Sequence, residues 1–308
     1  MPELPEVETI RLGLNKVLIG KKFLSIQILD KKIFPRDSEK ILNKTILGLD
    51  RRAKLIIFRF AGGINMVVHL KMTGQFIYNP SASFDKTQDE SSVQEKKRIA
   101  GGPRPTSPDE VVAGGHQSEE LFADVPNKHT RVIFKLPARA MLYYNDLIRY
   151  SWIKIMSDED FEKLSAEEFG PEPLSKNFTK LYLKDLFSKK RSNIKKILTD
   201  QKQIAGIGNI YADEILYDAQ IDPRRITTDL KENEIKKIYN SIKKILKLGI
   251  KHQGSSIKNY VDHEGKKGRM QNYFKVYGKN KEKCECGGEI GKIRLNGRGT
   301  HFCPKCQK

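Results

Sequence analysis

Apolar residues recur at helical spacing along the first part of the chain. The positions that share one helical face are Leu4, Val7, Ile10, Leu14, Val17 and Leu18. Pro2 suits the start of a helix, acidic residues in the first turns suit the positive end of its dipole, and Gly20 suits its end. We therefore expect a helix over residues 1–19 that packs one face against a core.

A β-rich stretch follows this helix. Alternating or continuous apolar runs predict strands at 23–29, 54–60, 64–70, 131–136 and 141–146. The second and third runs flank Ala61-Gly62-Gly63 and the last two flank Pro137, so each couple is expected to form a pair of adjacent strands. Many strands with few helices indicate a sandwich or barrel-like domain.

The second half of the chain has helical patterns instead. A segment typical of a linker, Gly170-Pro171-Glu172-Pro173, comes first. Helices are expected at 179–190, 192–201, 209–219 and 232–249. We divide this α+β chain into a domain of residues 1–150, a linker of 151–175, a helical domain of 176–271 and a terminal segment of 272–308.

Residues 79–127 interrupt the strand pattern. This segment is rich in Ser, Gly and Pro and holds 9 acidic and 5 basic side chains. Its net charge is −4, so the rest of the chain carries about +23. The composition predicts a disordered or loosely packed insertion, and its sign argues against a role in binding polyanions.

The overall charge points to a polyanionic partner. The chain has 57 Lys plus Arg against 38 Asp plus Glu, a net charge of +19. Duplex DNA is the foremost candidate because its phosphates attract basic proteins whatever their sequence. An RNA-binding or ribosome-associated protein, or a basic bias of the source, remains an alternative. No apolar run is long enough to span a membrane and no signal peptide is visible, so we expect a cytoplasmic protein.

The N-terminus carries a possible nucleophile. Removal of Met1 would expose the secondary amine of Pro2, whose pKa near that of an α-amino group leaves part of it unprotonated at neutral pH. Its attack on a sugar carbon would give an iminium, and the carboxylates of Glu3 and Glu6 could move protons beside it. An ordinary capped helix explains the same residues, and these residues alone favour that reading.

Four cysteines lie in the last 25 residues, as Cys284-x-Cys286 and, 16 residues later, Cys303-x2-Cys306. Two close pairs of thiolates suit one tetrahedral Zn²⁺ with a structural role. Reduced free thiols are the alternative.

Elsewhere, Gly206 and Gly208 predict a tight turn whose amides could bind a phosphate at the helix that begins at Asn209, although such turns are common.

Taken together, six segments in order resemble bacterial formamidopyrimidine-DNA glycosylases. They are PELPEVET (2–9), the Arg51-Arg52-Ala53-Lys54 motif before a strand, HLKMTG (69–74), FGPEPL (169–174), KKILTDQKQIAGIGNIYADEILY (195–217) and GRGTHFCPKCQ (297–307). The resemblance covers most of the chain but not 79–127. It implies an N-terminal β-sandwich with a flanking helix, a helical domain with a helix–two-turn–helix motif, and a zinc-finger hairpin.

The resemblance also implies an activity. Such an enzyme flips an oxidised purine, 8-oxoguanine or a formamidopyrimidine, out of duplex DNA, excises it, and nicks the strand by β,δ-elimination. Pro2 is then the nucleophile, Glu3 the main proton shuttle supported by Glu6, and Lys54 a phosphate ligand that assists proton transfer. We expect a bacterial monomer that acts at the nucleoid on DNA with oxidised bases or abasic sites.

Further residues are implied as DNA contacts. Lys195, Asn209 and Arg298 match residues that hold phosphates, and Met72, on a loop supported by His69, matches one that fills the gap left by the flipped nucleotide. The segment 254–271 matches the loop over the flipped base. Its candidate pocket contacts are Ser255, Ser256 and Tyr260.

Two departures from the family pattern concern zinc and DNA. The first cysteine pair is one residue shorter than the usual Cys-x2-Cys, which puts its geometry in question. After Asp146, Tyr150 stands where the family has Phe, and Ile148 stands where it has Arg. Discrimination of the base opposite the lesion is therefore relaxed or performed by Arg149, unless Ile148 and Tyr150 simply pack in the sheet.

Two other functions remain open at this point. A relative that removes oxidised pyrimidines is disfavoured by the PELPEVE start. A non-catalytic protein that binds damaged DNA is disfavoured by the intact Pro2, Glu3, Glu6 and Lys54, although the short cysteine pair and Ile148 leave room for it.

Overall fold

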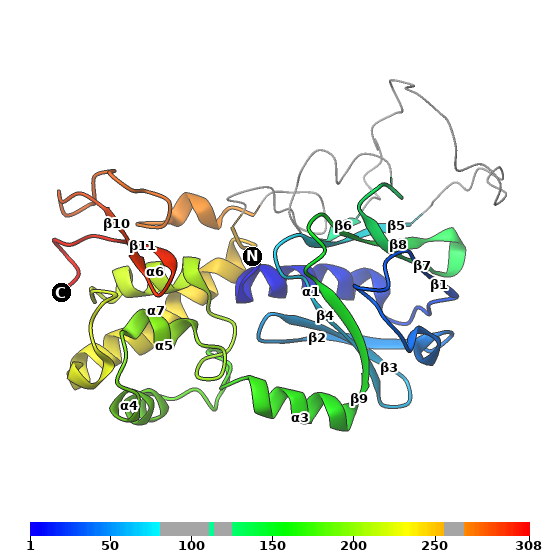
Figure 1. Ribbon diagram of the computed structural model, residues 1–308, viewed down its shortest axis with the longest axis horizontal. Helices are drawn as coiled ribbons and strands as arrows, with labels where there is room; N and C mark the ends of the chain where they lie inside the picture. Colours follow the sequence, from blue (N-terminus) through cyan, green and yellow to red (C-terminus); the bar gives the residue numbers. More distant parts are fainter. Residues whose placement is uncertain (81–110, 114–124, 256–267) are drawn as a thin grey trace, which may run out of the picture.

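The computed structural model describes residues 1–80, 111–113, 125–255 and 268–308. The strands of the N-terminal half gather at one end of the molecule and the helices of the C-terminal half at the other (Figure 1). The N-terminus lies between these two ends, so the residues beside it can contact both halves.

Two antiparallel sheets form the N-terminal half. The five-stranded sheet has the order β1-β7-β8-β5-β6, with β1 (Ser25–Ile28), β5 (Gly74–Asn79), β6 (Val111–Ala113), β7 (Thr130–Lys135) and β8 (Met141–Asp146). The four-stranded sheet has the order β2-β3-β4-β9, with β2 (Ile46–Arg52), β3 (Leu55–Phe60), β4 (Ile64–His69) and β9 (Trp152–Ser157). The expected pairs β3–β4 and β7–β8 are both confirmed.

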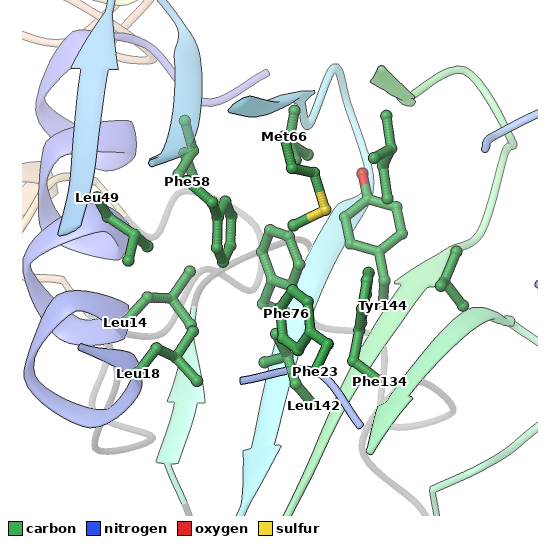
Figure 2. Close-up of a cluster of buried hydrophobic side chains, with 14 of the residues drawn as sticks. Leu14, Leu18, Phe23, Leu49, Phe58, Met66, Phe76, Phe134, Leu142 and Tyr144 are labelled. Atoms are coloured by element: carbon green, nitrogen blue, oxygen red, sulfur yellow. The ribbon is translucent and has the colours of Figure 1, made fainter. Parts of the chain in front are cut away.

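The main core lies where these sheets and helix α1 (Leu4–Leu18) meet (Figure 2). Phe58 comes from one sheet and Phe76 and Phe134 from the other, and all three are fully buried. Leu14 and Leu18 of α1 close the same cluster. The apolar face predicted for the first helix is therefore the face that packs on the sheets.

Helices build the C-terminal half around a second core. They are α4 (Lys180–Lys189), α5 (Ile194–Thr199), α6 (Asn209–Asp218) and α7 (Glu232–Lys251), and the chain ends in the antiparallel hairpin of β10 (Gly291–Leu295) and β11 (Arg298–Phe302). Short 3-10 helices lie at Ser38–Ile41, Pro137–Arg139, Thr227–Asp229 and Met270–Tyr273. The four predicted helices are all present, each within a few residues of its expected bounds.

Helix α1 joins the two halves. Its first residue, Leu4, is part of the C-terminal core, whereas Val7 and the later apolar residues belong to the N-terminal core. Leu4 N donates to Gly206 O at 3.0 Å. The helix begins at Leu4 rather than Met1 because Glu3 is its N-cap, with Glu6 accepting from Glu3 N at 2.9 Å.

The expected linker and the expected insertion both contain regular structure where the chain is described. Residues 151–175, expected as a linker, contain β9, which pairs with β4, and α3 (Asp158–Glu168). Ile153 of β9 is fully buried in the N-terminal core, so this strand belongs to that half of the chain. The connection without regular structure is confined to 169–179. In the insertion, β6 pairs with β5, and the disorder expected at 81–110 and 114–124 falls outside the described residues.

Candidate active site

The Glu3 carboxylate is held at the N-terminus of helix α6. It accepts hydrogen bonds from the backbone N–H groups of Gly208 (2.8 Å), Ile210 (2.9 Å) and Tyr211 (3.3 Å). Free amides at a helix N-terminus attract negative charge. A β-carbon at Gly208 would lie 2.3 Å from Glu3 Cδ, so glycine is required for this approach. The start of α1 and the start of α6 therefore form one unit.

This contact corrects one expectation. The turn at Gly206 and Gly208 was predicted to offer its amides to a phosphate, but the Glu3 carboxylate occupies those amides. Gly206 N donates instead to Gln201 Oε1 at 2.8 Å. The anion at this helix N-terminus is supplied by the protein itself.

Glu6 lies buried behind Glu3. Its Oε1 accepts from the Tyr211 hydroxyl (2.9 Å), and from Ser255 through both the backbone N–H (2.7 Å) and the hydroxyl (3.1 Å). Burial raises the pKa of Glu6, and the nearby charge of Glu3 raises it further. Two carboxyl groups in different environments stand side by side, an arrangement suited to acid and base roles. Ser255 is thus a partner of Glu6, while Ser256 and Tyr260 lie outside the described residues.

Lys54 is a buried cation. It is 5 % exposed, and its ammonium makes no hydrogen bond or ion pair with any residue that the structure describes. Burial lowers the pKa of Lys54, the charge of Glu3 opposes this, and the charge of Arg298 adds to it. A buried cation without a partner is costly unless an anion joins it. Its position therefore favours binding of an anionic group.

A pocket of about 180 Å³ opens in front of this lysine. We call it the N-terminal pocket. The polar and charged residues that line it include Lys54, His69, Lys71 and Arg298, and Met1 lines it as well. These residues come from the β2–β3 turn, the end of β4, the loop after it and the start of β11. Three cations thus meet at the N-terminus of the chain, although they are far apart in sequence.

His69 contributes a neutral ring to the pocket. Its Nδ1 accepts from Lys71 N at 3.0 Å, which assigns the ring proton to Nε2. Burial, together with the charges of Lys71 and Lys54, lowers the pKa of His69 to about 3. The imidazole is therefore neutral near pH 7 and offers one N–H donor. The supporting role expected for His69 agrees with this bond to the loop that precedes Met72.

The linker fixes the turn that carries Lys54. Glu172 accepts from Ala53 N (2.6 Å) and pairs with Arg51 Nη1 (2.8 Å) and Arg52 Nη1 (3.3 Å). Arg52 also donates to the carbonyl oxygens of residues 169 and 170 at 2.9 Å each. Sequence reasoning treated Glu172 only as part of a linker. The one available signal was that Glu172 is the single charged residue of the FGPEPL segment.

Lys195 is buried and paired within the protein, and its expected contact with a phosphate stays a prediction. It is 2 % exposed, and its Nζ lies 2.6 Å from Asp213 Oδ1. It also donates to Thr300 Oγ1 (2.7 Å) and Gly299 O (3.2 Å). Lys195 therefore anchors the β10–β11 hairpin to the helical half.

Asn209 shares this anchoring task. Its Nδ2 donates to Gly299 O at 2.9 Å, next to Arg298. Asp213 completes the network by accepting from His301 N at 2.9 Å. Together these bonds hold the residue that follows Arg298 and so position Arg298 at the N-terminal pocket. Direct contact of Asn209 and Arg298 with a phosphate stays a prediction.

The four cysteines converge. The sulfur atoms of Cys284, Cys286, Cys303 and Cys306 all lie within 4.8 Å of one another. The contacts Cys284–Cys306 and Cys286–Cys303 measure 3.6 and 3.5 Å. Tetrahedral thiolates about 2.3 Å from Zn²⁺ would be spaced by a similar distance. The donors fit a structural zinc ion, and the short Cys-x-Cys pair does not prevent it.

Two loops form an exposed tip beside β4 and β8. Met72, Ile148 and Tyr150 have exposed side chains, so Ile148 and Tyr150 do not pack in the sheet. Ile148 N donates to Thr73 Oγ1 at 3.1 Å, which joins the two loops. Arg149 pairs with Asp30, with Nε 2.6 Å from Oδ2, and its contact with DNA stays a prediction.

No helix among the described residues combines the length and apolar character needed to cross a lipid bilayer.

Comparison with known proteins agrees with this geometry. Residues 1–153 match the formamidopyrimidine-DNA glycosylase N-terminal domain, residues 169–261 the formamidopyrimidine-DNA glycosylase H2TH domain, and residues 281–308 the zinc finger found in FPG and IleRS. The chain is 36 % identical to the formamidopyrimidine-DNA glycosylase of Carboxydothermus hydrogenoformans and 35 % identical to that of Lactiplantibacillus plantarum, with 100 % of each chain covered in both cases.

Solved structures give the same result. The chain is similar to Lactococcus lactis Fpg in complex with abasic-site DNA, with a TM-score of 0.80, 34 % identity and 99 % of each chain covered. A Lactococcus lactis FPG mutant in complex with Fapy-dG-containing DNA matches equally well, with 100 % of each chain covered. Fold, zinc-finger cysteines and sequence all agree, and the chain belongs to the formamidopyrimidine-DNA glycosylase family.

Proposed function

We propose that this protein is a DNA glycosylase and AP lyase that removes oxidised purines, 8-oxoguanine and formamidopyrimidines, from duplex DNA. The observation that carries the proposal is Lys54, a buried cation without a partner in the described structure, at the N-terminal pocket. Such a site suits a DNA phosphate. The DNA-bound relatives and the net charge of +19 support the same partner.

Pro2 is the proposed nucleophile. Met1 lines the N-terminal pocket, so its removal would turn the Pro2 nitrogen toward the space beside Lys54. Glu3 follows Pro2 directly and is fixed by three amides of α6, so the position of the amine is set by the helical half.

The proposed reaction proceeds in two stages. The Pro2 nitrogen forms a bond to C1′ of the flipped nucleotide, the bond from C1′ to the base breaks, and the departing base takes up a proton. Opening of the sugar ring, with a proton delivered to its oxygen, gives an iminium. Loss of a C2′ proton expels the 3′ phosphate, and a further proton loss expels the 5′ phosphate, which together constitute β,δ-elimination.

The chain's own residues would divide this work. Glu3 is the proposed shuttle for protons on the sugar, and Glu6, whose pKa is raised by burial, supports it. Lys54 would hold a flanking phosphate and assist proton transfer. The neutral ring of His69 and the guanidinium of Arg298 would donate hydrogen bonds to the sugar–phosphate backbone of the DNA. Met72 and Tyr150 would fill the gap left by the flipped nucleotide.

Borohydride trapping on abasic-site DNA tests the nucleophile. We expect a covalent protein–DNA product with the native N-terminus, and none when a short uncleavable peptide precedes Pro2. A matched protein with the same peptide at its C-terminus should trap normally. A crosslink that persists with the blocked N-terminus, but is lost in Lys54→Ala, would identify Lys54 as the nucleophile and overturn the mechanism.

Substrate class needs a separate assay. Duplexes with one 8-oxoguanine, one formamidopyrimidine or one oxidised pyrimidine, each opposite its normal partner, are incubated with excess protein. Faster excision of the two purine lesions is expected. Preferential excision of the pyrimidine would make the protein an oxidised-pyrimidine glycosylase, and damage-specific binding with no excision would make it a non-catalytic binding protein.

A further inference from the structure

The exposed tip formed by the loops around Met72 and Ile148 presents mainly apolar and aromatic side chains to solvent. Three apolar or aromatic side chains project from it, with exposed fractions of 47 % for Met72, 41 % for Ile148 and 66 % for Tyr150. Apolar wedges of this kind enter base stacks by shape and stacking. Met72 and Ile148 carry no donor, and the one hydroxyl of Tyr150 cannot make the bidentate contact that distinguishes one base edge from another.

The polar side chains of the same loop are engaged within the protein. Asp146 accepts from the Thr73 hydroxyl, and from Ser151 through its backbone N–H (2.9 Å) and its hydroxyl (2.5 Å). Thr73 in turn accepts from Ile148 N. Lys71, beside Met72, lines the N-terminal pocket, and the Tyr150 hydroxyl is a single group that cannot make a bidentate contact, which leaves Arg149.

Arg149 is paired with a buried carboxylate, although its own side chain is 52 % exposed. Its Nε donates to Asp30 Oδ2 at 2.6 Å, and Asp30 is buried at the end of the segment that follows β1. Asp30 is itself fixed because its Oδ1 accepts from Lys32 N at 3.0 Å. Arg149 also has a left-handed backbone with φ 59°. Release of Arg149 would leave the Asp30 charge in a buried position without its main partner.

We infer that this protein does not read the base opposite the damaged nucleotide, and that Ile148, with Arg149 locked to Asp30, is the reason. This inference rests on the proposed function, since it concerns the orphaned base at a flipped nucleotide. The tip fills the gap through Met72, Ile148 and Tyr150, and any of the four bases is accepted opposite it. A guanidinium at position 148 would instead present paired donors to a base edge.

Binding to an abasic-site analogue tests the inference without any excision. Four duplexes each carry one tetrahydrofuran residue opposite C, T, A or G, and the dissociation constant of the full-length protein is measured for each at one salt concentration. We expect the four values to lie within about threefold of each other. A bidentate contact to a base discriminates by roughly 5- to 150-fold, so a spread of fivefold or more would overturn the inference.

Three variants sharpen the result. Ile148→Arg should widen the spread to about tenfold or more by adding the missing donors, and Arg149→Ala should leave the spread unchanged. Asp30→Asn, which keeps the size of the side chain but releases Arg149, should widen it. A preference in the wild type that disappears in Arg149→Ala would show that Arg149 reads the base, against the inference.

The two proposals fail differently. Unequal binding of the four analogue duplexes overturns the inference about the opposite base and leaves the proposed glycosylase activity intact. Binding of all four no tighter than an undamaged duplex overturns both, because the protein would then not recognise the damaged position at all.

Discussion

Gly208→Ala should displace the Glu3 carboxylate from the N-terminus of α6. Gly208 has φ −126° and ψ −159°, an extended conformation open to any residue, so alanine adds no backbone strain. Its β-carbon would lie 2.3 Å from Glu3 Cδ and 2.4 Å from Oε1. The carboxylate must move, and it accepts three backbone hydrogen bonds that depend on its present position.

The size of the effect follows from those bonds. A hydrogen bond to a charged group contributes about 1.5–3 kcal/mol. With one or two of the three lost, we expect the free energy of unfolding to fall by about 2–5 kcal/mol. Because Glu3 adjoins Pro2, the proposed nucleophile would also be misplaced, and a shift of about 1 Å can reduce a reaction rate about 100-fold.

Urea unfolding and single-turnover excision of 8-oxoguanine measure the two effects. Gly48→Ala is the matched control, since a β-carbon there meets nothing within 4 Å. If the clash with Glu3 is the cause, Glu3→Ala combined with Gly208→Ala should be no less stable than Glu3→Ala alone. The reasoning is refuted if Gly208→Ala is as stable as the control. It is also refuted if the double variant loses as much free energy of unfolding as Glu3→Ala and Gly208→Ala lose in sum.

Three other perturbations have expected outcomes. Asp213→Asn leaves the buried ammonium of Lys195 without its partner at 2.6 Å, and should lower the free energy of unfolding by about 3–5 kcal/mol in chemical denaturation. Tyr217→Phe removes the hydroxyl 3.3 Å from Cys284 Sγ, and should speed zinc release to a chromogenic chelator about 10-fold, because outer-shell partners tune metal affinity. The pKa of His69 falls to about 3 in the folded protein from its ordinary value of 6.5, so its contribution to stability is present above pH 6.5 and is lost as the pH falls toward 3. Between pH 6.5 and 5.5 the wild type should lose about 1 kcal/mol relative to His69→Gln.

Each of these has a control. Replacing Lys195 by Met together with Asp213 by Leu should recover much of the stability lost in Asp213→Asn, since no unpaired charge is then buried. Unchanged zinc release in Tyr217→Phe would show that its hydroxyl does not act on the metal site. A parallel pH dependence of the wild type and His69→Gln would contradict the lowered pKa of His69.

Local patterns in the sequence determine much of this protein. Alternation and apolar runs predict the β3–β4 and β7–β8 pairs, and helical spacing predicts α1 and α4 to α7, because each pattern records which face of an element is buried. The cysteine spacing predicts a zinc site for a similar reason, since its four ligands lie on two short turns. Such information lies within a few residues along the chain.

The tertiary structure alone decides which distant charged groups meet. Glu3 caps a helix that begins more than 200 residues later, Lys195 is buried against Asp213, and Arg149 is paired with Asp30. From the sequence alone, Glu3 is expected to be a free carboxylate, and Lys195 and Arg149 are expected to be cations available to DNA. A charge takes its role from the partner and the solvent exposure that packing assigns to it, and neither is encoded in its neighbours along the chain.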